Sequence, residues 1–248
     1  LGPENVLAIA MPGPYSSDHS LSDARDLAER LGIPLVTIPI SGALESVREA
    51  IDPAFDELGD RRLGAALPDL AEENAQSRLR GLVAMTVSNR TGALVLTTGN
   101  KSELSVGYCT LYGDMNGGLA VISDLTKGQV YALARWMNAN FGACGLRAAP
   151  IPESTLVKPP SAELAPNQRD QDSLPPYDDL DRIVRRYVEH HESQERIIAE
   201  TGIDEAVVAR VCRMIDVNEY KRKQLTTGLK VSGVAFGVGR RMPIARGW

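Results

Sequence analysis

Short aliphatic runs that alternate with helical stretches are the strongest constraint on how this chain can fold. The runs Val6 to Met11 and Leu35 to Ile40 are expected to be strands, and residues 20–31 between them carry a helical apolar stripe. A third run, Leu94 to Leu96, is expected to be a strand buried on both faces, because it is continuously apolar. Strands separated by helices favour parallel pairing with right-handed crossovers. We therefore expect an α/β fold with a Rossmann-like parallel sheet and flanking helices.

Two further helices are expected in the first half of the chain, over Leu44 to about Leu58 and Leu70 to Val87. The second of these should direct its apolar residues inward, namely Leu79, Leu82, Val83 and Val87.

The second half of the chain is expected to be mainly helical. Pro150 to Pro176 is a long polar stretch rich in proline, and a loop of that length in a compact domain is usually functional or disordered. The elements expected around it are a short strand over Ala120 to Ile122 and helices over Lys127 to Asn140, Leu180 to His191, Ser193 to Glu200 and Glu205 to Leu225.

Composition excludes several classes of protein. The formal net charge of −5 argues against a surface that coats nucleic acid. The cysteines, Cys109, Cys144 and Cys212, are far apart and form no metal-ligand spacing, so a reduced cytoplasmic setting is expected. No apolar run is long enough to span a membrane and no export signal opens the chain, so we expect neither membrane insertion nor secretion.

The stretch LVLTTGNKSE places polar residues where the third strand ends. Gly99 and Asn100 interrupt the strand, and Lys101 to Val106 can begin a helix. The carboxyl ends of strands in open parallel sheets are where ligands bind. The alternative is that Thr97 and Thr98 only cap the following helix.

Two other patterns could bind anions. Asn74 and Arg78 are spaced i, i+4 on one helical face and could together donate to a phosphate or carboxylate, although a solvated polar face has the same spacing. Lys127 falls in the first turn of a helix, where the helix dipole opposes a cation. Such a lysine either meets an anion or extends into solvent.

Three loop or helix-end motifs complete the candidates. Gly107 to Gly118 (GYCTLYGDMNGG) combines glycines, tyrosines and an aspartate, which suits either close approach to a ligand or a turn-rich connector. KPPSAEL presents Ser161 after a rigid bend, and Asn218 to Gln224 gathers three cations that a helix C-terminus alone would explain. The spacing of these residues indicates only an α/β protein with an anion or nucleotide site.

Several of these motifs in order resemble one known family. ENAQSR, LVLTTGNKSELSVGYCTLYGDMNGG, KPPSAEL followed by DQDSLPPYDDLD, and IDVNEYKRKQ are similar to the synthetase domain of glutamine-dependent NAD synthetases, as is the ending from Pro243 to Trp248. The resemblance implies an adenine-nucleotide alpha-hydrolase-like (ATP pyrophosphatase) domain over residues 1–248 that usually forms a homo-oligomer, a dimer. It also implies that ATP adenylates the nicotinate carboxylate of deamido-NAD and that ammonia then displaces AMP to give NAD.

The resemblance also assigns roles to residues of this chain. Glu103 and Lys127 are implied to be catalytic, and Glu103 would also hold Mg²⁺. The residue before YGD is Leu111, and this feature and the GNKSE run resemble the glutamine-dependent branch of the family. ATP contacts are implied for Met11, Thr98, Lys127 and Ser161, and deamido-NAD contacts for Asn74, Arg78, Glu103, Tyr112, Gly113 and Lys221.

Two features of the family are absent from these residues. One is the SGGxDS loop that cradles pyrophosphate, which is expected upstream of Leu1, and the other is a nitrilase-like glutaminase domain that supplies ammonia from glutamine. We therefore expect a synthetase domain truncated at its N-terminal edge and impaired by itself, whose partners are small-molecule substrates and that glutaminase domain.

Two alternatives remain open. Another ATP pyrophosphatase amidotransferase, of the GMP- or asparagine-synthetase type, would also adenylate a carbonyl compound but lacks GNKSE and KPPSAEL. A non-catalytic nucleotide-binding module of the universal-stress type shares the layered fold but needs neither the proline-rich loop nor Arg78.

Overall fold

The computed structural model describes residues 1–58, 69–237, 239, 240 and 242. The chain forms two compact units. The first unit comprises Leu1–Ala84 and Leu133–Asp172, and the second comprises Met85–Ala132 and Ser173–Trp248. The family-like ending, Pro243 to Trp248, lies outside the described residues.

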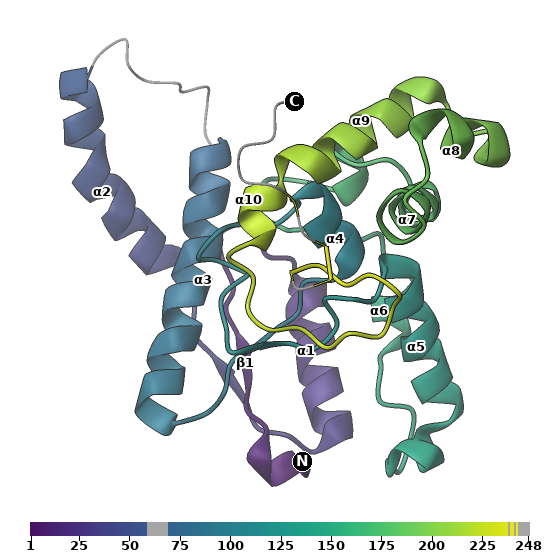
Figure 1. The fold of residues 1–248 in the computed structure, drawn as a ribbon. Helices are drawn as coiled ribbons and strands as arrows, with labels where there is room; N and C mark the ends of the chain where they lie inside the picture. The colour runs from purple at the N-terminus through teal and green to yellow at the C-terminus, as the bar shows by residue number, and fades with distance from the viewer. Residues whose placement is uncertain (59–68, 238, 241, 243–248) are drawn as a thin grey trace. The chain divides into compact units, whose positions relative to one another are not determined.

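A parallel strand pair forms the centre of the first unit. Strand β1 (Ala8–Ala10) pairs with β2 (Leu35–Thr37), and helix α1 (Asp18–Leu31) connects them and contacts β1 (Figure 1). Helix α1 begins after Ser17, whose hydroxyl accepts a hydrogen bond from the Ser20 amide at 3.2 Å. The expected strand–helix–strand order is therefore confirmed, with shorter strands.

Two longer helices follow, α2 (Ser41–Leu58) and α3 (Leu70–Thr91). The expectation that α3 buries Leu82 is wrong, because that side chain remains 62% exposed. The residues that α3 buries include Glu72 and Gln76. Each side chain is paired in part: Arg48 pairs with the Glu72 carboxylate, and the Gln76 amide donates to the Leu164 carbonyl at 2.9 Å. Glu72 Oε2 and Gln76 Oε1 have no hydrogen-bond partner among the described residues.

The segment predicted as a long loop contains short helical pieces. Helix α6 (Glu153–Val157) and the 3₁₀ turn η4 (Asp170–Asp172) interrupt it. The other 3₁₀ turns of the first unit are η1 (Pro3–Asn5) and η3 (Phe141–Cys144).

A second parallel pair lies in the second unit, where β3 (Leu96–Thr97) pairs with β4 (Leu119–Ala120). The expectation that the aliphatic run is buried on both faces is wrong: Leu94 is 64% exposed and Leu96 is 48% exposed. Thr97 is the buried residue of this strand, because its hydroxyl bonds the Asp114 carbonyl. The α/β fold with parallel strands is confirmed.

Helices make up most of the second unit. Helix α4 (Lys101–Val106) contacts α7 (Tyr177–Val184) and α9 (Glu205–Val217), and the π-helical turn η5 (Arg185–Glu189) extends α7 (Figure 1). Two more helices are α8 (Gln194–Thr201) and α10 (Glu219–Arg222). The aliphatic core of this unit contains Leu180, Ile183, Val184, Val188, Ile197, Val208, Val211 and Ile215.

The last predicted helix is divided in two. Residue Asn218 separates α9 from α10, and its side-chain amide donates to the carbonyls of Val106 (3.0 Å) and Met214 (2.9 Å). Because this amide caps α9 and also reaches α4, the chain turns where the sequence pattern predicted a continuous helix.

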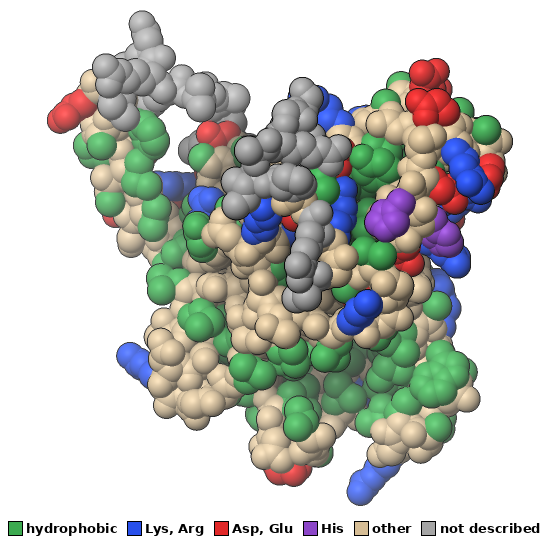
Figure 2. Space-filling model, viewed as in Figure 1, with side chains coloured by type: hydrophobic (Ala, Val, Ile, Leu, Met, Phe, Trp, Pro, Cys, Tyr) green, Lys and Arg blue, Asp and Glu red, His purple; other side chains and the backbone are tan. Residues whose placement is uncertain are grey.

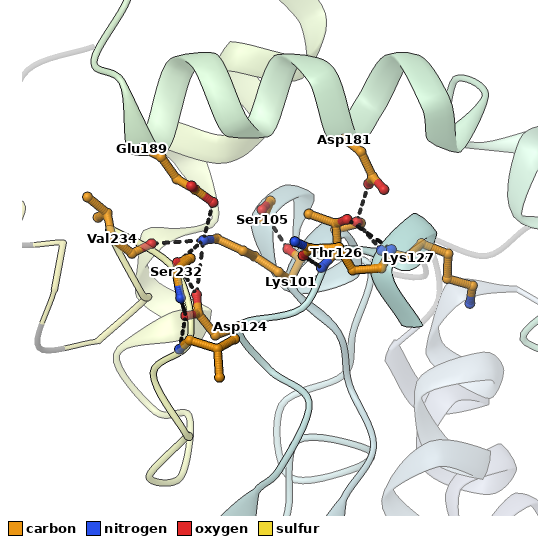
Figure 3. Close-up of polar contacts among 12 residues, drawn as sticks. Lys101, Ser105, Asp124, Thr126, Lys127, Asp181, Glu189, Ser232 and Val234 are labelled. Carbon is orange, nitrogen blue, oxygen red and sulfur yellow. Dashed lines mark hydrogen bonds and ion pairs between the residues drawn. The ribbon is translucent and has the colours of Figure 1, made fainter. Parts of the chain in front are cut away.

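One fully buried cation connects the elements of the second unit. The Lys101 ammonium lies 2.9 Å from the Asp124 carboxylate and 2.7 Å from that of Glu189 (Figure 3). It also donates to the Ser232 hydroxyl at 2.7 Å and the Val234 carbonyl at 2.8 Å. Figure 3 shows these groups converging from three separate parts of the chain.

Two further features are the distribution of charge on the surface and the length and polarity of the helices. Figure 2 shows acidic and basic side chains interspersed on the face that it draws. Within the described ranges, no helix is both long and apolar enough to cross a bilayer.

Removal of the buried ammonium should destabilise the protein. Replacement of Lys101 by Met leaves two carboxylates without their counter-charge, and we expect a loss of about 3–5 kcal/mol in the free energy of unfolding. Urea denaturation at neutral pH measures this loss. The exposed Lys230→Met substitution is the control and should leave the urea midpoint unchanged; equal stability of both variants would contradict the central role of Lys101.

Candidate functional site

The end of β3 positions a carboxylate through a reciprocal helix cap. Asn100 precedes α4, and its side chain accepts a hydrogen bond from the Glu103 amide at 3.1 Å. The Glu103 Oε2 atom accepts from the Asn100 amide at 3.2 Å in return. Asn100 therefore caps the helix, and the alternative in which Thr97 and Thr98 cap it is wrong.

The other oxygen of this carboxylate faces a lysine. Lys127 begins α5 (Lys127–Ala139), and its ammonium lies 2.8 Å from Glu103 Oε1 and 5.2 Å from the centroid of the Tyr177 ring. Both side chains of the ion pair retain 18% exposure. The carboxylate and the ring offset the unfavourable position of a cation at a helix N-terminus. The structure thus brings together Glu103 and Lys127, which the sequence placed far apart.

The two threonines after the aliphatic run differ in environment. Thr97 is 5% exposed and bonded to the Asp114 carbonyl, whereas Thr98 is exposed directly before the turn that leads to Glu103. Thr98 is therefore the threonine whose hydroxyl a ligand can reach.

Lys221 contacts the glycine-rich loop that follows α4. Its ammonium donates to the carbonyls of Gly107 and Cys109, each at 2.7 Å. The predicted substrate residues Lys221, Tyr112 and Gly113 therefore belong to one local structure. Tyr112 has a positive φ of 65° and is 63% exposed, and the Gly113 amide donates to the Thr110 carbonyl at 3.0 Å.

Two of the three cations of the NEYKRKQ motif, Lys221 and Arg222, have specific partners beyond a helix dipole. Arg222 is 1% exposed, donates to the carbonyls of Leu104 and Ser105, and stacks 4.7 Å from the centroid of Phe236. These carbonyls lie at the end of α4, where intrahelical partners run out. Burial lowers the pKa of the Arg222 guanidinium, and Glu219 partly offsets that effect.

Nucleophilic chemistry at Cys109 is disfavoured. Burial, with a smaller contribution from the Asp114 carboxylate, raises the pKa of this thiol to about 12. The thiol therefore stays protonated at neutral pH.

Sequence reasoning missed Arg80 in the first unit. Arg80 lies on α3 and donates from Nε to the Met11 carbonyl at 3.0 Å, at the residue expected to meet ATP. Burial lowers the pKa of its guanidinium, and the Glu163 carboxylate partly offsets this. Arg80 follows Gln76 by four residues, so the two lie on one face of the helix. This spacing was the one feature of the sequence that could have pointed to Arg80.

A carboxylate also anchors the loop that carries Ser161. Glu163 has a φ of +52°, and its carboxylate accepts from the Ser17 amide (3.2 Å) and hydroxyl (2.7 Å) and from the Ser20 hydroxyl (2.6 Å). Ser161 is exposed, donates to the Gln168 carbonyl and accepts from the Glu163 amide at 3.0 Å. The start of α1 thus anchors the loop two residues after Ser161.

Asn74 and Arg78 lie on α3 as their spacing predicts; Asn74 is half-buried and Arg78 is exposed. The predicted site residues are divided between the two units. Those of the first unit are Met11, Asn74, Arg78 and Ser161, and those of the second are Thr98, Glu103, Tyr112, Gly113, Lys127 and Lys221.

The described residues offer no clustered set of ligands to a metal. No group of three or more histidine, cysteine or acidic side chains converges in the parts of the chain that the structure describes. Mg²⁺ often uses one or two carboxylates together with substrate phosphates, so a single carboxylate such as Glu103 fits that mode of binding.

Comparison with known proteins identifies the chain's relatives. The family model described as NAD synthase matches residues 1–225. The chain is 52% identical over 246 residues to a glutamine-dependent NAD(+) synthetase of Synechocystis sp. and 48% identical over 244 residues to one of Thermotoga maritima. These alignments cover 99% and 98% of this chain but 41% and 40% of the relatives, so the chain spans about two fifths of their length.

Solved structures give a consistent result. A glutamine-dependent NAD+ synthetase from Acinetobacter baumannii, in complex with ADP, is 41% identical with a TM-score of 0.57, and the match covers 100% of this chain and 42% of that one. A glutamine-dependent NAD(+) synthetase from Cytophaga hutchinsonii is 24% identical with a TM-score of 0.73. The match covers 96% of this chain and 38% of that one, and it supports the fold alone.

The Glu163 anchor should depend on pH. Burial opposes ionisation of this carboxyl, but hydrogen bonds from Ser20 and Ser17 outweigh it and hold its pKa below the ordinary value of 4.5. Its stabilising effect is therefore fully present above about pH 4.5 and is lost as the pH falls through the lower folded-state pKa. We expect Glu163→Gln to cost about 1 kcal/mol at pH 7 and progressively less below pH 4.5.

Urea denaturation of the wild-type protein and of the Glu163→Gln variant at several pH values measures this difference. Glu153→Gln, the same change at an exposed position, is the control. A cost for Glu163→Gln that stays constant down to pH 3 would contradict the assignment.

Proposed function

Because the chain belongs to the NAD synthase family, we propose that it performs the ATP-dependent amidation of deamido-NAD to NAD, with ammonia supplied from glutamine. The activity, its substrates and its partners are proposals, since the chain spans about two fifths of its relatives' length. The observation that carries the proposal is the Glu103–Lys127 pair at the end of β3. It places a cation beside a carboxylate at a strand end, where α/β folds bind ligands.

The reaction needs a good leaving group on the nicotinate carboxyl. In the proposed first step, a carboxylate oxygen of deamido-NAD forms a bond to the α-phosphorus of ATP, and pyrophosphate leaves. Ammonia then attacks the carbonyl carbon, AMP leaves with the electrons of the broken bond, and a proton is released to solvent. The chain's contribution is to align the two nucleotides and to offset phosphate charge.

Each predicted residue has a proposed role in this scheme. Lys127 offsets charge on the departing pyrophosphate, while Thr98 and Ser161 hydroxyls contact ATP and the backbone at Met11 receives adenine. Deamido-NAD would be held by residues of α3, α4, the glycine-rich loop and α10, namely Asn74, Arg78, Glu103, Tyr112, Gly113 and Lys221.

Mg²⁺ is part of the proposal and would be held by Glu103 together with phosphate oxygens. The bound ion would supply charge stabilisation on the phosphates. In the structure both oxygens of Glu103 are engaged, one by Lys127 and one by the Asn100 amide. Lys127 and the Asn100 amide therefore orient the carboxylate.

The proposed partner is a glutaminase domain that releases ammonia, in line with the greater length of the relatives. We also propose a cytoplasmic location and a homo-oligomer. Cys109, Cys144 and Cys212 are free in the structure, which supports a reducing compartment.

Binding measurements test the substrate assignment. We expect calorimetry to detect deamido-NAD binding in the presence of ATP and magnesium, and Arg78→Ala to weaken that binding at least tenfold while the affinity for ATP stays the same. Arg90→Ala, an exposed position in the last turn of the same helix, is the control. Binding of ATP without any binding of deamido-NAD would support the nucleotide-binding module instead, and a defect confined to ATP would contradict the role of Arg78.

Activity measurements test Glu103. In the full-length protein supplied with ammonia, ATP and deamido-NAD, we expect Glu103→Ala to lower kcat by about 100-fold or more, because the charge that orients the metal and Lys127 is lost. Glu195→Ala, an exposed position at the start of α8, is the matched control. An unchanged kcat for Glu103→Ala would refute its role.

A further inference from the structure

Helix α7 directs two side chains at the start of α5, where Lys127 lies. Asp181 accepts a hydrogen bond from the Gly128 amide at 2.9 Å through Oδ2 and one from the Ser102 hydroxyl through Oδ1. Tyr177 lies four residues earlier, on the same helical face, and holds its ring 5.2 Å from the Lys127 ammonium. Figure 3 shows Asp181 pointing from α7 toward the first turn of α5. Neither side chain belongs to the site residues assigned above.

Ser102 connects the two members of the ion pair through their backbones. Its hydroxyl accepts from the Lys127 amide at 2.8 Å and donates to Asp181, and Ser102 directly precedes Glu103 on α4. A hydroxyl has a single hydrogen, so the carboxylate that accepts it also fixes the direction of the lone pairs that meet the lysine amide. Asp181 and Ser102 thereby link the first turn of α5 to α4.

A side chain at residue 128 would crowd this carboxylate. A Cβ atom built on Gly128 would lie 3.1 Å from Asp181 Oδ2, which is tighter than an ordinary contact. The carboxylate therefore lies directly against the first turn of α5, where backbone amides lack helical partners and negative charge is favoured.

We propose that Asp181 and Tyr177 are positioning residues for the Lys127–Glu103 pair, an inference that rests on the proposed function. Asp181 fixes the backbone from which Lys127 extends, and the Tyr177 ring limits where its ammonium can lie. Misplacement of a reacting or charge-stabilising group by about 1 Å can cost roughly 100-fold in rate. Helix α7 therefore sets the separation of cation and carboxylate before any nucleotide binds.

The position of the ammonium can be measured without activity. Brief acylation of the 248-residue chain with acetic anhydride, followed by peptide mass spectrometry, gives the reactivity of Lys127 relative to the exposed Lys230. We expect Asp181→Asn and Tyr177→Leu to raise the relative labelling of Lys127 several-fold. Tyr177→Phe retains the ring and should match wild type. Asp179→Asn, the same change on the same helix at a side chain that is 37% exposed, is the control.

Kinetics then separate positioning from general stability. In NAD formation by the full-length protein with ammonia, Asp181→Asn should lower kcat by about 10- to 100-fold and leave the KM for deamido-NAD within about twofold. Tyr177→Phe should retain the kcat that Tyr177→Leu loses. Equal labelling and equal kcat for Asp181→Asn and Asp179→Asn would overturn the inference, as would a loss in Tyr177→Phe as large as that in Tyr177→Leu.

The two proposals can fail separately. If the wild-type protein forms no NAD while Lys127 labelling still responds to Asp181→Asn but not to Asp179→Asn, the proposed function fails and the positioning role stands. If NAD forms and labelling does not respond, the positioning role fails alone.

Discussion

The buried ammonium of Lys101 is the interaction on which the second unit depends. A cation without solvent is tolerated only when charges and dipoles surround it, and here two carboxylates, a hydroxyl and a carbonyl do so. Burial raises the pKa of the Asp124 carboxyl, but hydrogen bonds from Lys101 and from the amides of Ser232 and Val231 outweigh this and leave it below the ordinary value. Because Lys101 opens the helix that carries Glu103, the site depends on this cluster.

Much of the fold was predictable from local patterns, and the exceptions have tertiary causes. The α4 helix over Lys101 to Val106 and the strand–helix–strand order follow from caps, glycines and apolar periodicity. The exposure of Leu82 and the burial of Gln76 on α3 could not be predicted, because the partner of Gln76 is the Leu164 carbonyl, far along the chain. Likewise, Asn218 divides a periodic helix because its amide reaches the Val106 carbonyl.

The sequence predicted which residues form the candidate site, but it did not predict which of their side chains contact one another. Family resemblance pointed to Glu103 and Lys127, but only the folded chain shows that their side chains pair. Asp181 could not be found from spacing, since a carboxylate among the acids of DQDSLPPYDDLD has no distinguishing pattern. Its relevance comes from the Gly128 amide that it meets in space.

The π-helical turn η5 explains how one helix can serve both carboxylate contacts. Asp181 and Glu189 are eight residues apart, and in an uninterrupted α-helix residues at that spacing point about 80° away from each other. The wider turn over Arg185–Glu189 reduces this angular offset, so both carboxylates reach consecutive residues at the start of α4 (Figure 3). If the same residues were wound as an uninterrupted α-helix, without loss of a residue, Glu189 would turn away from Lys101. The π-helical winding of this turn therefore places the two carboxylates on one side of the helix.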